Sequence, residues 1–218
     1  MPLHESIEKV SGFIRKKGHE FEFKVEEPAS SADIAETARR LGIHALPPSS
    51  VDFYHKFGNG LQIRWLSGEE EDSAFANFTL LPLRDAVDRF LEEKEGGGPV
   101  WDDLNDFDGC QCQSLAKETA RESRSYLNII DEGNGDAVSI DVIHGAVRFN
   151  SHDWFDGGIG INGLVMAADI GSFLKAWSKR CFQTPKSLDW TTVLGPRGVD
   201  WNHEDFDRDF SLQEVVYG

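Results

Sequence analysis

The sequence predicts an α+β fold, with a single antiparallel β-sheet in meander order and helices packed on one face. Helical and strand periodicities occupy separate segments of the 218 residues. Three strand-like segments in the second half are joined by short links rich in Gly, Asn and His, and strands joined by tight turns run antiparallel. With 39% hydrophobic residues, the chain can bury the core of one domain spanning residues 1–218.

The first helix is predicted over residues 29–43. Ser30 or Ser31 can cap it, and Asp33 lies three residues after Ser30, which is the spacing of a capping box. Gly42 ends the pattern, because glycine readily takes the left-handed conformation found after helices.

A second helix is predicted to begin at Pro47 and Pro48, where a missing N–H has no intrahelical partner to lose. Its apolar stripe recurs every three residues, at Val51, Tyr54 and Phe57. Residues 58–60, Gly-Asn-Gly, turn the chain into a predicted strand at 61–67, in which apolar and polar residues alternate.

The same two periodicities predict most of the remaining elements. Residues 73–83 read as a strand, and residues 83–95 and 169–182 read as helices. Residues 96–117 carry glycines, a proline and acids without a period, which predicts a long loop or insertion. Residues 18–28 alternate and are compatible with an edge strand, but the pattern leaves open whether the two ends of the chain pack on the core.

Residues 133–154 carry side chains of the kind that catalysis uses, namely Asp136, Asp141, His144, His152 and Asp153. The periodicity predicts strands at 137–143 and 146–151, joined by a two-residue turn at His144-Gly145. The apolar residues that share the buried face are Val138, Ile140 and Val142. General acid–base catalysis needs two groups that converge on one atom, and nothing in this spacing makes the polar groups converge. We therefore interpret the stretch as a structural hairpin.

The other chemical motifs are incomplete. Residues 157–163 contain G-x-G-x-x-G, but no helix opens on these glycines, so we interpret the segment as a flexible loop. The acidic segments 102–109 and 202–210 lack the spacing of a calcium loop or a zinc HExxH motif. The three cysteines are Cys110, Cys112 and Cys181, and they form no CxxC pair. We expect no metal and no cofactor.

The chain is strongly acidic. Acids outnumber bases 38 to 22, giving a net charge of −16, with clusters at 69–72, 95–116 and 199–218. Such a surface repels phosphate backbones and attracts basic proteins, so we expect a protein partner and no nucleic acid. No apolar stretch is long enough to span a membrane. The first residues lack the pattern of a signal peptide, which predicts a cytoplasmic protein.

Short motifs recur in a recognisable order. A Leu-Pro precedes a helix with Tyr and Phe in its stripe, which ends in Asn-Gly. A Gly-Asp, a strand with a second Asp, a Gly turn and a His-Asp follow, and a helix with an inward Phe closes the set. The residues are Leu46, Pro47, Tyr54, Phe57, Asn59, Gly60, Gly135, Asp136, Asp141, Gly145, His152, Asp153 and Phe173. This order resembles the SUKH superfamily of Smi/Knr-like domains. The resemblance covers about residues 30–182, with an insertion at 96–117 and an acidic C-terminal extension at 183–218.

The resemblance implies a binding module without a catalytic centre. Bacterial members are typically immunity proteins that bind and neutralise a toxin, often a nuclease or a deaminase, so we expect a basic toxin domain as the partner of a monomer or weak homodimer. Exposed aromatic and acidic residues are the candidate contacts: Trp101, Asp102, Asp103, Asp106, Asp108, Trp154, Trp201, Glu204 and Asp205. Two alternatives remain open. One is a regulatory or scaffold protein of cell-wall synthesis, and the other is a hydrolase that uses Asp141, His152 and Asp153.

Overall fold

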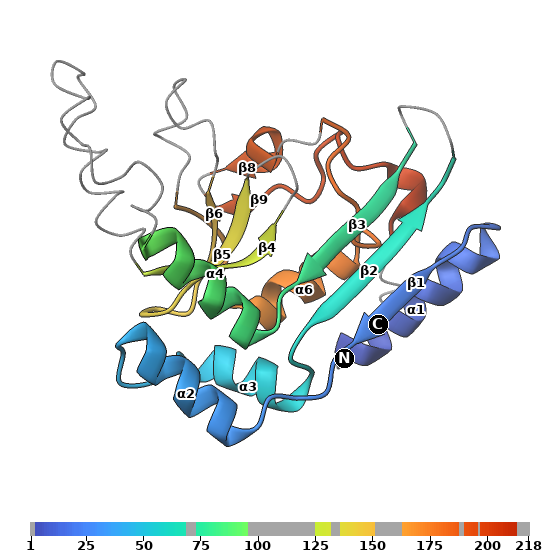
Figure 1. Cartoon of the computed structure of the whole chain (residues 1–218). Helices are drawn as coiled ribbons and strands as arrows, with labels where there is room; N and C mark the ends of the chain where they lie inside the picture. The colour runs from blue at the N-terminus through green and yellow to red at the C-terminus, as the bar shows by residue number, and fades with distance from the viewer. Residues whose placement is uncertain are drawn as a thin grey trace, which may run out of the picture.

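The computed structural model describes residues 3–68, 73–95, 125–131, 136–150, 163–187, 190–195 and 197–212. These residues form an α+β fold in which seven antiparallel strands build one sheet in the meander order β1-β2-β3-β4-β5-β6-β7 (Figure 1). The strands are β1 (Glu22–Val25), β2 (Leu61–Leu66), β3 (Phe75–Leu80), β4 (Tyr126–Asp131), β5 (Ala137–Asp141), β6 (Val147–Asn150) and β7 (Leu164–Ala167). The helices are α1 (Leu3–Lys16), α2 (Ser31–Leu41), α3 (Pro48–Lys56), α4 (Leu83–Glu95) and α6 (Ile170–Ser178).

The predicted ends of α2 are confirmed. The Ser30 hydroxyl accepts a hydrogen bond from the Asp33 backbone N–H, the Asp33 carboxylate accepts one from the Ser30 N–H, and Gly42 follows the helix at a φ of 71°. These contacts satisfy backbone donors and acceptors that a helix end otherwise leaves without partners. Helix α3 begins at Pro48, as predicted.

The sheet is divided by a narrow junction. Strands β2 and β3 pair along six residues each, whereas β3 and β4 share only the pair Leu80–Ile130. Along β2, the buried side chains of Leu61, Ile63 and Trp65 alternate with more accessible neighbours. One face of the sheet therefore points into the core. In Figure 1, α1 and α6 lie on the far side of β1, β2 and β3, which leaves the near face of these strands open.

The core extends beyond residues 30–182 at both ends. Ile7, Val10 and Ile14 of α1 are fully buried in the same apolar cluster as the sheet. Helix α1, which the sequence reasoning did not anticipate, packs against α6. From the C-terminal part of the chain, Trp190 and Phe206 join this cluster. The described parts of both chain ends thus belong to the domain.

Hydrogen bonds at the turn after α6 hold the beginning of the C-terminal part of the chain against the sheet. Cys181 and Phe182 both have positive φ, an unfavourable conformation for residues other than glycine. Two buried indoles brace the turn, since Trp65 Nε1 donates to the Cys181 carbonyl at 2.7 Å and Trp177 Nε1 donates to the Gln183 carbonyl at 2.6 Å. These hydrogen bonds join neutral groups and lie among stacked aromatic rings. Without the two carbonyls, both indole N–H groups would lack an acceptor.

One local prediction needs correction, and one strand was missed. The β5–β6 link is not a two-residue turn at His144-Gly145, because β5 ends at Asp141 and β6 begins at Val147. The link is closed by a hydrogen bond from the Gly145 N–H to the Asp141 carbonyl, with Gly145 at a φ of 84°. In addition, Gly163 leads directly into β7, a short strand that the sequence reasoning missed.

Candidate functional site

The two halves of the motif set meet in space at Gly145. A Cβ atom on this residue would lie 3.0 Å from Pro47 Cβ and 3.0 Å from the Ser49 hydroxyl. Pro47 and Leu46 are buried at the start of α3. Glycine is required here for two reasons, namely the positive φ and the close approach of α3. The β5–β6 turn therefore rests on the N-terminal end of α3.

The remaining motif residues of the first half also support the fold. Asn59 Oδ1 accepts a hydrogen bond of 2.9 Å from the Leu83 N–H, which satisfies a free donor at the beginning of α4. Tyr54 is fully buried and Phe57 nearly so. Burial raises the pKa of the Tyr54 phenol far above its usual value, so this group stays neutral. Phe173 of α6 is buried against Trp177.

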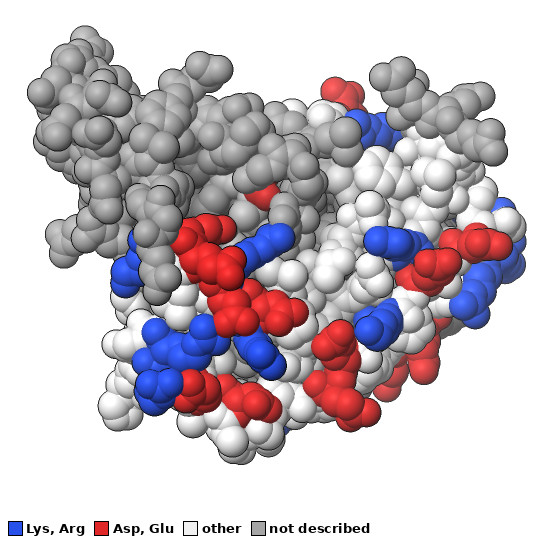
Figure 2. Space-filling model, in the orientation of Figure 1, with Lys and Arg blue, Asp and Glu red and all other residues white. Residues whose placement is uncertain are grey.

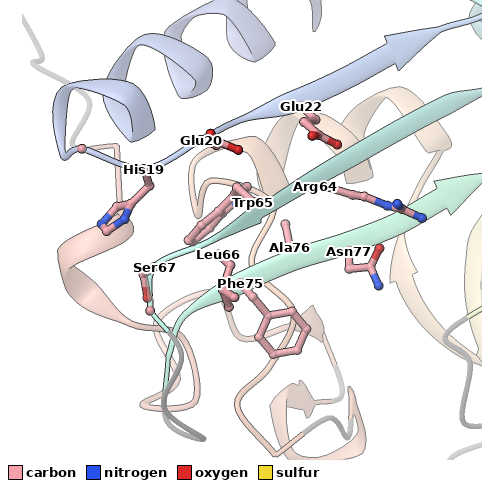
Figure 3. A pocket seen from close by; sticks show the side chains of 12 residues that line it. His19, Glu20, Glu22, Arg64, Trp65, Leu66, Ser67, Phe75, Ala76 and Asn77 are labelled. Carbon is pink, nitrogen blue, oxygen red and sulfur yellow. The ribbon is translucent and has the colours of Figure 1, made fainter.

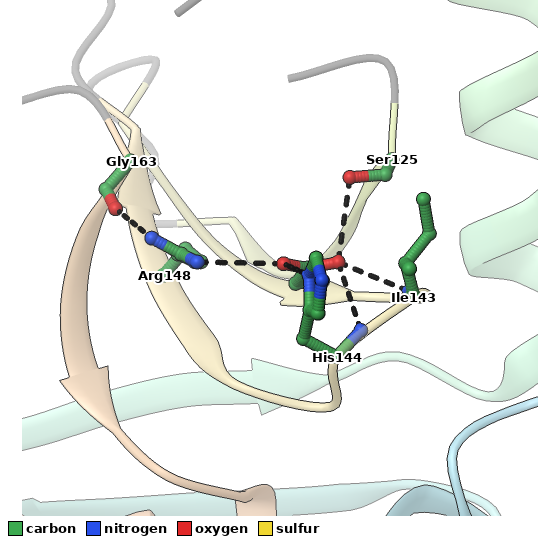
Figure 4. Close-up of polar contacts among 6 residues, drawn as sticks. Ser125, Ile143, His144, Arg148 and Gly163 are labelled. Atoms are coloured by element: carbon green, nitrogen blue, oxygen red, sulfur yellow. Dashed lines mark hydrogen bonds and ion pairs between the residues drawn. The ribbon is translucent and has the colours of Figure 1, made fainter. Parts of the chain in front are cut away.

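The Asp141 carboxylate accepts several hydrogen bonds, and Figure 4 shows its contacts. Its Oδ1 accepts backbone N–H groups of Ile143 at 3.0 Å and His144 at 3.2 Å, and a more distant hydroxyl of Ser125 at 3.4 Å. Its Oδ2 lies 2.8 Å from His144 Nδ1 and 3.4 Å from an Arg148 guanidinium nitrogen. The side chain is only 3% exposed. We call this arrangement the Asp141 clasp.

The pKa of Asp141 is held below its ordinary value. Burial alone would raise the pKa, but the hydrogen bonds from His144 and from the Ile143 and His144 amides, together with the charge of His144, outweigh that effect. Arg148 donates a second hydrogen bond to the Gly163 carbonyl at 2.8 Å, and its guanidinium lies 5.5 Å from the ring centre of Tyr126. The clasp thus links β4, β5, β6 and the start of β7.

A second polar row crosses the same strands. Ser139, fully buried, donates to Asn128 Oδ1 at 2.6 Å and accepts from Asn150 Nδ2 at 2.6 Å. These residues come from three neighbouring strands, since Ser139 pairs with Asn128 on one side and with the strand of Asn150 on the other. Sequence reasoning missed both Arg148 and this row. Only the register between strands brings them together.

The clasp has the geometry of a structural group. A general base needs a lone pair that faces a substrate, whereas both oxygens of Asp141 are engaged within its own hairpin and with Arg148. His152 and Asp153, the other members of the hydrolase hypothesis, lie outside the described residues, as does Gly135. Asp136 is buried at the start of β5. Within the described ranges, no group of three or more His, Cys, Asp or Glu side chains is arranged to hold a metal.

The predicted partner contacts fall into two sets. Trp201 is half-buried and packs on Phe206 at 5.7 Å between ring centres, and its carbonyl accepts from Arg180. Glu204 is exposed. The Asp205 carboxylate accepts hydrogen bonds from Thr192 at 2.6 Å and Ser187 at 2.8 Å, which lower its pKa. The other set lies outside the described residues: Trp101, Asp102, Asp103, Asp106, Asp108 and Trp154.

A shallow groove crosses the open face of β1, β2 and β3, and Figure 3 shows the side chains that line it. Glu22, Arg64 and Asn77 occupy matched positions on the three strands. Leu66 and Phe75, a cross-strand pair, lie at the end of the groove, with Leu66 53% exposed. Figure 2 shows acidic and basic side chains interspersed over this part of the surface.

Comparisons with known proteins leave the family open. No protein-family model matches the chain, and no curated protein sequence matches it. Among the helices of the described residues, none is both long and apolar enough to cross a membrane.

Proposed function

We propose that this chain is a binding protein of the SUKH type that acts as an immunity protein, neutralising a toxin domain by direct contact. The observation that carries the proposal is the meeting of the two motif halves, where Gly145 lies against Pro47 and Ser49. Residues that are far apart in the sequence and that resemble one family signature serve one piece of the fold. This contact supports the proposal, because residues from both halves of the motif set then contribute to one structural unit of this chain.

Two further features support binding over catalysis. The carboxylate of Asp141, the strongest catalytic candidate of the described hairpin, is engaged by its own turn and by Arg148. The net charge of −16 favours association with a basic protein, because complementary charge accelerates encounter and suppresses wrong partners. Many toxins that act on nucleic acids are basic at the surface that contacts phosphate.

The test uses the toxin domain encoded beside this gene. The two proteins are purified separately and mixed at low ionic strength, and complex formation is followed by size-exclusion chromatography with light scattering. In parallel, the toxin domain is expressed in cells with and without this chain. The proposal expects a stable complex that weakens as salt is added, together with restored growth. A toxin domain that neither associates nor is neutralised would reject the immunity function.

A further inference from the structure

We propose that the outer edge of β1 is the docking strand for the partner, which adds a basic extended segment to the sheet there. The inference rests on the proposed function, because it specifies where and how a basic protein partner binds. Among the described residues, β1 is an end strand of the seven-stranded sheet and pairs only with β2. A partner that adds a strand obtains its affinity from main-chain hydrogen bonds and its specificity from side chains on alternate positions.

The register identifies the peptide groups that are available. The Glu26 N–H donates to the Gly60 carbonyl of the neighbouring strand end at 3.1 Å. Hydrogen-bonded and non-hydrogen-bonded pairs alternate in an antiparallel ladder, so the peptide groups of Lys24 and Glu22 also face β2. Those of Phe23 and Val25 then point away from β2, toward the outer edge.

The strand is unusually accessible for part of a sheet. Glu22, Phe23 and Lys24 are all exposed, and Phe23 is 44% exposed. In Figure 1, β1 forms the border of the sheet, with α1 behind it. Its neighbour β2, by contrast, buries every second side chain. A segment added beside β1 would cover the Phe23 ring and satisfy the outward peptide groups at the same time.

The charges around β1 select the occupant. Glu20, Glu22, Glu26 and Glu27 are all exposed. Three bases lie near them: Lys24 forms an ion pair with Glu26 at 3.4 Å, Arg64 lies opposite Glu22 on β2, and Arg15 donates to the Phe21 carbonyl, so acids still outnumber bases along this strand. A basic strand would find a carboxylate near each end of β1. A second copy of this chain would not, because antiparallel pairing of β1 with itself about Lys24 places Glu22 opposite Glu26. Like charges in directly opposite positions destabilise a strand pair, so the same residues disfavour edge-to-edge self-association in this register.

The main-chain bond can be tested with a matched pair of variants. Phe23→Ala removes the ring and keeps the outward N–H, whereas Phe23→Pro removes both, and proline is tolerated at a strand edge where the N–H faces outward. Two probes are titrated by fluorescence anisotropy at low salt, namely the adjacent-gene toxin domain and a labelled peptide in which lysine and valine alternate. We expect Phe23→Pro to bind about five- to tenfold more weakly than Phe23→Ala, the loss of one hydrogen bond. Thermal melting verifies that both variants fold.

The charge selection is tested by reversal, which does not depend on how proline is tolerated. Glu20→Lys with Glu22→Lys should weaken both probes about tenfold or more at low salt, and the difference should shrink as salt is added. The control is Asp85→Lys with Glu92→Lys on α4, which changes the net charge equally at two exposed positions away from β1. A peptide in which glutamate and valine alternate should bind wild type far more weakly than the lysine peptide.

Each result is decisive. Toxin binding that is equal in wild type, Phe23→Pro and the Glu20/Glu22 reversal overturns the docking strand and leaves the immunity function in place. Lysine-peptide binding that is lost in these variants, together with a toxin domain that does not bind, supports the docking strand and rejects the immunity function. A wild-type chain that binds neither probe overturns both. Equal losses in the α4 control would also overturn the docking strand, since net charge alone would explain the binding.

Discussion

The Asp141 clasp makes a quantitative prediction about stability. Asp141→Ala removes the acceptor for the Ile143 and His144 amides and the ion-pair partner of Arg148. Asp141→Asn keeps one oxygen, which can still accept both amides, but it loses the charge that faces Arg148. Because the carboxylate is only 3% exposed, water does not replace the lost contacts without cost.

The two substitutions should therefore differ in size. Two turn hydrogen bonds at about 1 kcal/mol each and a partly buried ion pair at about 1 kcal/mol give Asp141→Ala a loss of about 3 kcal/mol. Asp141→Asn should lose about 1 kcal/mol, because only the ionic part is removed. For a chain of this size, the alanine variant should melt about 6–12 °C lower.

Urea unfolding followed by tryptophan fluorescence measures these free energies. Asp52→Ala serves as the control, because Asp52 also forms an ion pair, with Lys56 at 2.9 Å, but its side chain is 65% exposed. Exposed pairs contribute little, so this variant should stay within about 0.5 kcal/mol of wild type. If Asp141→Ala is as stable as the Asp52→Ala control, the clasp does not hold the hairpin.

Three further results are expected. The pKa of Asp141 is lowered in the folded state, so its stabilisation is present above the unfolded pKa of about 4 and is lost as the pH falls through the native pKa. In urea titrations at low pH, the difference in unfolding free energy between wild type and Asp141→Asn should therefore disappear. A difference that stays constant with pH would contradict this. Gly145→Ala should lose about 2 kcal/mol or more in the same assay, because the positive φ and the 3.0 Å approach to Pro47 both oppose a Cβ; wild-type stability would show that α3 can shift away. Asn59→Ala should lose about 1 kcal/mol by uncapping Leu83, while Asn59→Asp should lose less, and equal losses would assign the effect to packing.

The elements that local patterns specify were predictable from the sequence. The capping box of Ser30 and Asp33 needs only residues three positions apart, and the structure contains both of its hydrogen bonds. Helix α1 was missed, although Ile7, Val10 and Ile14 lie at helical spacing, so its signal was present in the sequence. Strand β7 gave no comparable signal, because its four residues, Leu-Val-Met-Ala, are all apolar and show no alternation with polar residues.

The error in the predicted β5–β6 turn did not change which side chains of the hairpin are expected to be buried. The predicted turn at His144-Gly145 would place Asp141 opposite Arg148, whereas Arg148 in fact pairs with Ser139. The difference in register is two residues. A shift of two keeps every side chain on its own face of a strand, so the burial of Val138 and Ile140 agrees with the sequence interpretation despite the wrong turn.

The polar clusters were not predictable, for a physical reason. The row of Asn128, Ser139 and Asn150 depends on the pairing between three strands, and β4 contains a register irregularity between Asn128 and Ile130. Pattern reasoning assigns faces within one strand, but it does not give the offset between strands. By contrast, the alternation at residues 18–28 was compatible with an edge strand, and β1 is an end strand of the seven-stranded sheet; only its pairing with β2 could not be read from its own residues.

A stoichiometric titration tests the binding function most directly. Increasing amounts of this chain are added to a fixed amount of the active toxin domain encoded beside its gene, and the remaining toxin activity is measured. A protein that acts by occupying its partner should abolish activity at equimolar amounts, with a residual that falls linearly up to that point. Complete loss of activity at far below equimolar amounts would indicate catalytic turnover, and undiminished activity in excess would exclude neutralisation altogether.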